Sequence, residues 1–564
     1  MKFNEYKYER PNLENIKCEF EKAINVIKTS NSVEDVIKVI DEINKLKEDI
    51  DTAMSLCSIR YTVNTNDEFY VKEQEFIDEN GPIISSYMNE YNKSLVECKF
   101  INELEEKYGK KLFDSIRLDL TTFSNEIIED LQEENKLCSK YSRLIASAKI
   151  PFDGKVLNLS QFAPYTTNKD RNIRREAEKA TSGFFQSKEE EFDELYDSLV
   201  KVRDRIARKL GFENFIPLAY ARFGRTDYDQ KMVANYRKQV YEDLVPVVCE
   251  MVKEQGKRLG IEDMKSYDLV LNFLSGNPKP KGNSKELVEK ANKMYHEMSK
   301  ETGVFFDFMK EKELLDLDAK EGKTSGGYCT YIPNYKSPFI FANFNGTSGD
   351  VDVLTHEAGH AFQVFSSRDI GVPEYLWPTM EACEIHSMSM EFFAWPWMEL
   401  FFEEDKDKYL FSHLSGTITF IPYGVLVDEF QHEIYANPNM SKDERKALWR
   451  KIEKKYLPYK VYENEFLDKG TYWYKQGHIF ESPFYYIDYT LAQVCAQQFW
   501  IKNQENHEKA WSDYYRLCCA GGSKTFLGLL EVANLKNPFI DGTVKYVVSH
   551  LKEWLDKVDK EKIK

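Results

Sequence analysis

The spacing of apolar residues follows a helical period over most of the first half of this chain. Apolar side chains recur every three or four positions, with charged residues between them and few turn residues. The pattern predicts helices at 33–57, 101–146, 170–209, 230–260 and 284–302. Between two of these segments, residues 150–165 contain proline and glycine and are predicted to form a loop. We therefore expect a predominantly α fold.

The pattern changes near the middle of the chain. Residues 337–344 are apolar and aromatic without helical spacing, and they follow turn residues at 325–328. This order predicts a loop that leads into a short strand beside the next helix. An exposed strand edge can bind an extended peptide through backbone hydrogen bonds. The alternative is a strand that only packs against the helix.

Length and composition set the expected organisation. At 564 residues the chain exceeds the size that one core normally supports, and 42% of its residues are hydrophobic. We expect two or more lobes, with a boundary near residue 190. The division would give an N-terminal helical lobe at 1–190 and a second, catalytic region at 191–564.

The net charge and the cysteines indicate which binding partners and which cellular compartment to expect. The net charge of −17 and the pI near 5.3 argue against nucleic acid or an anionic membrane as a partner. No signal peptide or apolar run of membrane-spanning length is expected. The ten cysteines are scattered without a C-x-x-C pair, which predicts reduced thiols and a cytoplasmic location. The oligomeric state is not indicated.

His356, Glu357 and His360 form the pattern His-Glu-x-x-His. Apolar residues at helical spacing surround them, so the pattern is predicted to lie on a helix. Two imidazoles four residues apart on a helix can reach one metal ion, and the glutamate between them lies beside a water bound to that ion. The pattern indicates a catalytic zinc site.

A second His-Glu pair serves as an internal comparison. His432 and Glu433 begin the same pattern, but Ala436 takes the position of the second histidine. We therefore predict a structural role for this pair.

A catalytic zinc ion usually takes three protein ligands and leaves one position open. The third ligand is expected from a second helix that crosses the first, and residues 378–391 are predicted to form it. The side chains there that can bind zinc are Glu381, Glu384, His386 and Glu391. Spacing alone does not choose among them.

The two motifs together resemble the thimet oligopeptidase and oligoendopeptidase F family of metallopeptidases. The resemblance is carried by residues 354–362 and by Glu384-Ile385-His386-Ser387, and the chain length resembles the compact Pz-peptidase branch. It implies that His356, His360 and Glu384 bind one Zn²⁺ ion and that Glu357 is the general base. It also implies a multi-lobed helical fold with a small sheet beside the zinc helix and a deep channel between lobes.

The family also carries tyrosine and histidine side chains toward the C-terminus, and residues 477–489 are similar. The resemblance implies that Tyr489 and His478, and next Tyr486, donate hydrogen bonds to the oxyanion of the reaction. The alternative is that the tyrosines only pack in the core. Residues 481–483 depart from the glycine-rich loop of the thimet-type branch, so no role is assigned to them.

The expected function is that of a zinc-dependent endopeptidase that hydrolyses short unfolded oligopeptides by attack of a metal-bound water. One alternative is a peptidyl carboxypeptidase with the same metal chemistry. Another is a peptide-binding protein that keeps zinc only for structure. Mn²⁺ or Co²⁺ would also suit a set of two histidines and one glutamate.

Overall fold

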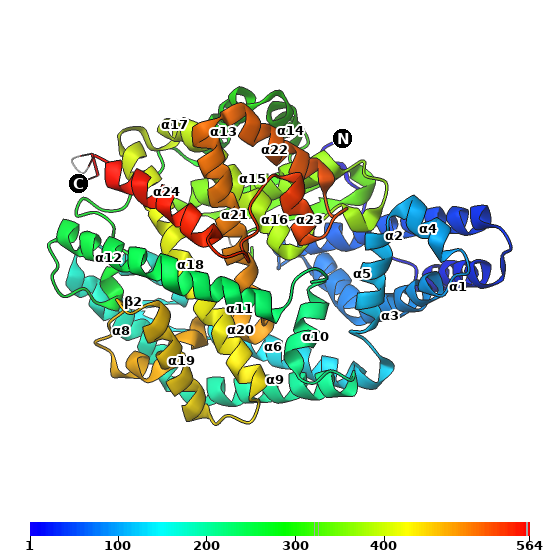
Figure 1. The fold of residues 1–564 in the computed structure, drawn as a ribbon, viewed down its shortest axis with the longest axis horizontal. Coiled ribbons are helices and arrows are strands. Elements are labelled where there is room, and N and C mark those ends of the chain that lie inside the picture. The colour runs from blue at the N-terminus through cyan, green and yellow to red at the C-terminus, as the bar shows by residue number, and fades with distance from the viewer. Residues whose placement is uncertain (321, 325, 560–561, 564) are drawn as a thin grey trace. The chain divides into compact units, whose positions relative to one another are not determined.

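The computed structural model describes residues 1–320, 322–324, 326–559 and 562–563, and helices dominate it (Figure 1). The chain forms two compact units, each built from three stretches of sequence. Unit 1 consists of Met1–Leu120, Lys279–Glu403 and Ala496–Leu535, and unit 2 of Thr121–Pro278, Glu404–Cys495 and Lys536–Lys564. The predominantly α fold is confirmed. The boundary near residue 190 stays a prediction, and that position lies within unit 2.

Unit 1 begins with long antiparallel helices that build their own hydrophobic core. Phe20, Ile43, Tyr91 and Phe113 are buried together in it, and α1, α2 and α3 lie in contact (Figure 1). The elements of this first stretch are η1 Phe3–Glu5, α1 Leu13–Thr29, α2 Val33–Val63, α3 Glu68–Val96, α4 Ile101–Tyr108 and α5 Lys110–Leu120.

The remaining elements of unit 1 surround a small sheet. They are α13 Ser284–Met298, α14 Lys300–Glu311, β3 Leu315–Asp318, β4 Tyr328–Ile332, η6 Pro333–Tyr335, β5 Ser337–Phe344, α15 Gly349–Ser367, η7 Pro373–Tyr375, α16 Met380–Phe393, η8 Trp395–Trp397, α17 Met398–Phe402, α22 His507–Ala520 and α23 Phe526–Val532.

The sheet has the strand order β3-β5-β4. β5 is the central strand; it runs parallel to β3 and antiparallel to β4. It occupies 337–344, the range predicted from its apolar run. β5 and β4 both pack against α15, so a small sheet does lie beside the helix that carries His356. Within the predicted loop at 325–328, Ser325 lies outside the described residues.

Unit 2 is built almost entirely of helices. Its elements are η2 Asn125–Ile127, α6 Ile128–Ala146, β1 Ile150–Phe152, β2 Lys155–Leu157, η3 Leu159–Phe162, α7 Ala163–Thr166, α8 Arg171–Ser187, α9 Glu189–Lys209, α10 Phe215–Arg222, α11 Gln230–Gln239, η4 Val240–Leu244, α12 Val245–Leu259, η5 Ser266–Asp268, α18 Lys406–Ala436, α19 Lys442–Tyr456, η10 Leu467–Thr471, η11 Tyr472–Lys475, α20 Gly477–Glu481 and α24 Thr543–Lys557. η9 Glu403–Asp405 and α21 Tyr486–Glu505 cross the limits of the two units.

The predicted helical segments are helical, but four of the five are interrupted. The segment at 101–146 breaks first at Gly109, whose φ of 90° no α-helical residue adopts. The segment at 230–260 contains the π-helical turn η4 just before Pro246, which has no N–H to continue the ladder. Lys188 and Ser299 end α8 and α13 and stand directly before the helices that follow.

The predicted loop at 150–165 is partly wrong. Residues 150–157 form an antiparallel hairpin of β1 and β2. Asp153 and Gly154 both have positive φ, as the tight turn between two strands requires. An Asp-Gly pair between apolar residues is a hairpin signal, so the sequence contained this information.

The stretch Met380–Ala436 is long and apolar enough to cross a membrane by length and composition, but 56% of its most apolar window is buried inside the protein. Buried core helices share these properties. The stretch therefore carries no membrane assignment.

Candidate metal centre

α15 brings the two histidines of the His-Glu-x-x-His pattern together. The helix begins after a loop whose backbone N–H groups at Asn345 and Gly346 donate to the Asp350 carboxylate, at 2.9 and 2.7 Å. One turn of helix separates His356 from His360, and their ring centroids lie 5.1 Å apart. Both rings are mostly shielded from solvent, with side chains 24% and 13% exposed.

Gly359 lets α16 approach α15 closely. A Cβ atom at Gly359 would lie 2.6 Å from Cα of Ser387 and 2.8 Å from the carbonyl oxygen of His386. No side chain fits in that space, so glycine is required where the two helices touch. The contact places Glu384 of α16 opposite both histidines.

Two imidazoles and one carboxylate converge at this contact. Oε2 of Glu384 lies 3.3 Å from Nε2 of His356 and 3.6 Å from Nε2 of His360. The ligand atoms of the three residues all lie within 4.8 Å of one another. In the described part of the chain, no other group of three histidine, cysteine or acidic side chains converges in this way. Two nitrogens and one oxygen are donors that zinc prefers, so these residues fit a zinc ion.

The other side chains that the sequence left open on α16 do not join this group. His386 is fully buried and donates from Nδ1 to the carbonyl oxygen of Ala382, 2.6 Å away, and burial lowers its pKa to about 4. Glu381 is buried near the start of the helix. Glu391 lies behind the site, where its Oε1 is 2.7 Å from Nδ1 of His356.

The charges of the centre depend strongly on one another. Burial opposes ionisation of Glu384, but His360 and His356 outweigh it and hold the pKa of this carboxyl well below its usual range. Burial also opposes protonation of His356, yet hydrogen bonds to Glu384 and Glu391 raise its pKa well above the ordinary value. Two carboxylates thus stabilise positive charge at His356, as they would stabilise a bound cation.

Glu357 is buried beside the start of β4. Its side chain faces Gly327, where a Cβ atom would lie 3.6 Å from Oε1 of Glu357. Burial raises the pKa of Glu357, and the neighbouring His356 and His360 partly oppose this. β4 is an edge strand of its sheet. A carboxylate, a potential cation site and a strand edge therefore meet on one side of α15.

The connection between α15 and α16 is fixed by the N-terminal helices. The Tyr375 hydroxyl accepts from the backbone N–H of Leu112 at 3.0 Å and donates to the carbonyl oxygen of Tyr108 at 2.9 Å. On the other side, Ser367 Oγ donates to the carbonyl oxygen of Leu376, 3.1 Å away. The first 120 residues therefore help to set the position of the helix that carries Glu384.

The predicted donors His478, Tyr486 and Tyr489 belong to unit 2, where the structure brings them together. The His478 ring lies 5.0 Å from the Tyr486 ring and 5.7 Å from the Tyr489 ring, between centroids. Their role toward the metal ligands, which belong to unit 1, stays a prediction.

The backbone before these tyrosines is strained and held from two sides. Phe484 has a φ of 71°, a costly conformation for a bulky residue. Its N–H donates to Oε1 of Gln431 at 3.0 Å, and its carbonyl oxygen accepts from Arg225 at 2.6 Å. Arg225 also pairs with Asp488 at 2.6 Å, and both side chains are fully buried. Sequence reasoning missed Arg225, because 263 positions separate it from Asp488.

The second His-Glu pair lies in a buried charge cluster of unit 2. Nδ1 of His432 is 3.2 Å from Oδ2 of Asp428, and Arg237 donates to the same carboxylate oxygen at 2.5 Å. Glu433, the next residue of the helix, is exposed. These contacts suit the structural role predicted for the pair.

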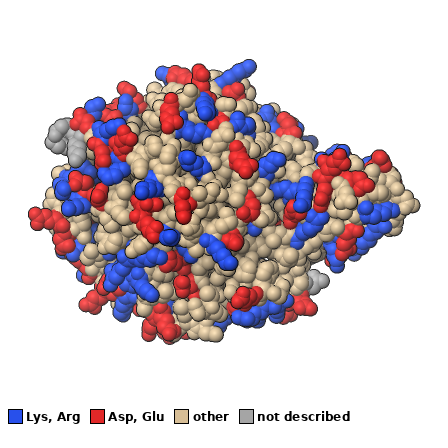
Figure 2. Space-filling view, viewed as in Figure 1, with Lys and Arg blue, Asp and Glu red and all other residues tan. Residues whose placement is uncertain are grey.

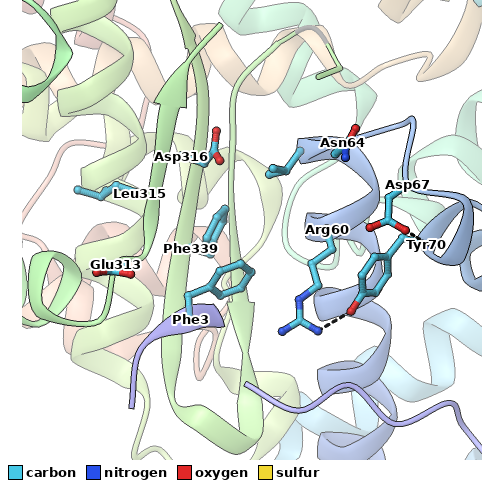
Figure 3. Close-up of a pocket in the computed structure, with 10 residues that line it drawn as sticks. Phe3, Arg60, Asn64, Asp67, Tyr70, Glu313, Leu315, Asp316 and Phe339 are labelled. Carbon is cyan, nitrogen blue, oxygen red and sulfur yellow. Dashed lines mark hydrogen bonds between the residues drawn. The ribbon is translucent and has the colours of Figure 1, made fainter. Parts of the chain in front are cut away.

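A separate pocket of about 260 Å³ in unit 1 lies next to β3 and the ends of α2 and α3 (Figure 3). Arg60, one of the residues that line it, donates to the Tyr70 hydroxyl at 2.7 Å and to the carbonyl oxygen of Tyr6 at 2.5 Å. None of the predicted site residues lines this pocket. On the face seen in Figure 2, acidic and basic side chains are interspersed.

Two family profiles match this chain. The profile of the peptidase M3 N-terminal domain matches residues 3–123, and that of peptidase family M3 matches residues 164–547. No match was found among curated proteins.

Solved structures of similar proteins cover nearly the whole chain. Pz peptidase A with an inhibitor is 54% identical, with a TM-score of 0.94, over 99% of this chain and 100% of that one. A chain described as oligoendopeptidase F from Bacillus anthracis strain Ames is 53% identical, with a TM-score of 0.90, over 100% and 99%. Oligoendopeptidase F from Enterococcus faecium, at 14% identity and a TM-score of 0.66 over 98% and 97%, shares the fold. The chain belongs to peptidase family M3 and is a metallo-oligopeptidase of the Pz-peptidase branch.

Proposed function

We propose that this peptidase is a zinc-dependent endopeptidase that cleaves short unfolded peptides. One observation carries the proposal: His356, His360 and Glu384 offer ligand atoms within 4.8 Å of one another, from two helices in contact at Gly359. These three residues would hold the ion. When bound, zinc supplies a Lewis acid that polarises the scissile carbonyl and makes water acidic near neutral pH.

Glu357 is the proposed general base. It follows His356 directly on α15 and is buried beside Gly327, so its carboxylate can take a proton from the attacking water. The same carboxyl then returns that proton to the leaving amine nitrogen. No other residue is required for these two proton transfers.

Tyr489 and His478, with Tyr486 beside them, are the proposed donors to the substrate's carbonyl oxygen as negative charge develops there. Each offers an O–H or N–H group, and their rings form one cluster. This role rests on the family resemblance and on the chemistry of the donors.

The edge of β4 is the proposed binding site for the substrate backbone. An extended peptide can add to an edge strand by main-chain hydrogen bonds with little dependence on its side chains. Gly327 has no side chain to separate such a peptide from Glu357. This arrangement supports broad specificity for unfolded peptides. The deep channel between lobes stays a prediction.

The test compares Glu357→Gln with Glu433→Gln, the matched change in the second His-Glu pair. Peptides of graded length with both ends blocked are incubated with each variant, with and without a chelator, and the products are identified by mass. Zinc content is measured in the same samples.

We expect internal cleavage by the wild type and by Glu433→Gln, loss of cleavage on chelation, and no turnover by Glu357→Gln with zinc still bound. Full activity of Glu357→Gln would remove it from the mechanism. The same peptides with free C-termini are digested in parallel, and cleavage of these alone, with release only of C-terminal fragments, would favour a peptidyl carboxypeptidase instead.

A further inference from the structure

A chain of hydrogen bonds within unit 2 ends at the His478 ring. The Tyr423 hydroxyl donates to Oε1 of Gln476 at 2.8 Å. Nε2 of the same amide lies 2.9 Å from Nδ1 of His478. Three side chains from α18, from the residue before α20 and from α20 itself are thereby connected.

The polarity of this chain follows from the chemistry of its groups. Burial keeps the pKa of Tyr423 well above its ordinary value, so the phenol retains its proton and needs an acceptor. The carboxamide oxygen of Gln476 is that acceptor. The amide then presents its N–H to the imidazole, and Nδ1 of His478 must accept. A neutral ring that accepts at Nδ1 carries its proton on Nε2.

Gln476 has little freedom to rearrange. It joins η11 to α20, and its backbone N–H donates to the carbonyl oxygen of Trp473 at 2.9 Å. Its own carbonyl oxygen accepts from the N–H of Ile479 at 3.0 Å. These two bonds fix the backbone of Gln476, and its side-chain amide contacts the Tyr423 phenol on one side and the His478 imidazole on the other.

We propose that Gln476 is a positioning residue that holds His478 in the tautomer with the proton on Nε2. This proposal rests on the proposed function, in which His478 donates a hydrogen bond to the substrate's carbonyl oxygen. A histidine in this tautomer is a donor without being charged. It therefore donates in its neutral form, and nothing needs to protonate it during the reaction.

The tautomer can be measured without substrate. Protein labelled with ¹⁵N at the histidine rings is studied by NMR, and the His478 signals are assigned by their loss in His478→Asn. In the wild type we expect Nδ1 to have the shift of an unprotonated nitrogen and Nε2 that of a protonated one. Gln476→Glu replaces the donor with an acceptor of the same shape, so we expect Nδ1 to become protonated.

Two further variants distinguish a loss of the His478 tautomer from a loss of folding stability. Gln476→Met keeps the volume but makes no hydrogen bond, and Tyr423→Phe removes the donor that orients the amide. Both should give a mixture of the two tautomers while the melting temperature stays close to that of the wild type. We expect kcat to fall about tenfold in Gln476→Met, with KM changed much less, as when an oxyanion donor is misplaced.

Protonated Nδ1 in the wild type, or ring shifts that stay the same in Gln476→Glu, would overturn the proposal. A failure of the proposed function gives a different result. If the tautomer changes as expected but His478→Asn keeps full turnover, Gln476 does set the ring and His478 is not a donor in catalysis.

Discussion

Nδ1 of His356 lies 2.7 Å from Oε1 of Glu391, on the same helix that carries Glu384. The ring donates through Nδ1 to Glu391, which leaves Nε2, 3.3 Å from Oε2 of Glu384, as the nitrogen that would bind a metal ion. Two glutamates of α16 thus contact this imidazole. Glu391 fixes the orientation of the ring, and Glu384 would bind the same ion as its Nε2.

Replacement of Glu391 by leucine should weaken zinc binding about 10- to 100-fold, because the ring of His356 loses the acceptor that fixes its tautomer. Competition with a chromophoric chelator measures the affinity. Glu399→Leu changes an exposed acidic residue that follows in α17 and should leave the affinity unchanged. Equal affinity of Glu391→Leu and wild type would show that Glu391 does not support the site.

Gly359→Ala should destabilise unit 1 and reduce zinc content, because a methyl group 2.6 Å from Cα of Ser387 forces α15 and α16 apart. We expect a loss of about 1–3 kcal/mol, as for overpacked cores. Gly416→Ala is the matched control, since that helical glycine has open space around it. It should be neutral or stabilise by up to about 1 kcal/mol. Denaturant unfolding of both apoproteins checks this, and equal stability would contradict the close contact.

Tyr489→Phe should lower kcat about 100-fold with KM less affected, because a hydroxyl that meets the developing oxyanion contributes mainly in the transition state. Tyr485→Phe removes a hydroxyl from the same ring cluster, to which no role is assigned, and should change kcat less than about twofold. Steady-state kinetics on a single blocked peptide measures both. An unchanged kcat for Tyr489→Phe would leave Tyr489 with a packing role.

Tyr472 should ionise near pH 8. Burial alone would raise its pKa, but Lys460 and Lys475 outweigh burial and lower the pKa to about 8. Nζ of Lys475 donates to the Tyr472 hydroxyl at 2.6 Å. The ultraviolet absorbance of tyrosinate is followed against pH in the wild type and in Tyr472→Phe. The difference between the two curves should show one tyrosine that ionises near pH 8, and Lys475→Met should raise the pH of this ionisation.

The same shift has a consequence for stability. The folded state releases the Tyr472 proton at a lower pH than the unfolded chain does. The contribution of Tyr472 to the free energy of unfolding therefore grows above about pH 8 and is complete above about pH 10. It is lost as the pH falls through about 8. The stability difference between wild type and Tyr472→Phe should follow this curve in denaturant titrations. A difference that does not change with pH would contradict the assigned ionisation.

Much of the local structure could be predicted from the sequence. The helical period located the helices, and the apolar run at 337–344 located β5. The helical period did not locate the breaks within helical runs, and one of these breaks involves a distant partner. Gly109 ends α4 where the Tyr375 hydroxyl, 266 positions away, leaves no room for a side chain. The hairpin at 150–157 was missed for a different reason, since its Asp-Gly turn signal was present.

Part of the candidate metal centre follows from the sequence and part only from the tertiary structure. The sequence alone determined that His356 and His360 lie on one face of a helix with Glu357 between them, because helical geometry fixes neighbours within a turn. Only the tertiary structure brought Glu384 to them and placed Glu391 behind His356, because the crossing of α15 and α16 depends on close packing at Gly359. Gln476 and Arg225 likewise acquire their roles from contacts between elements. Chain spacing sets what lies within one helix, and only packing sets which helices meet.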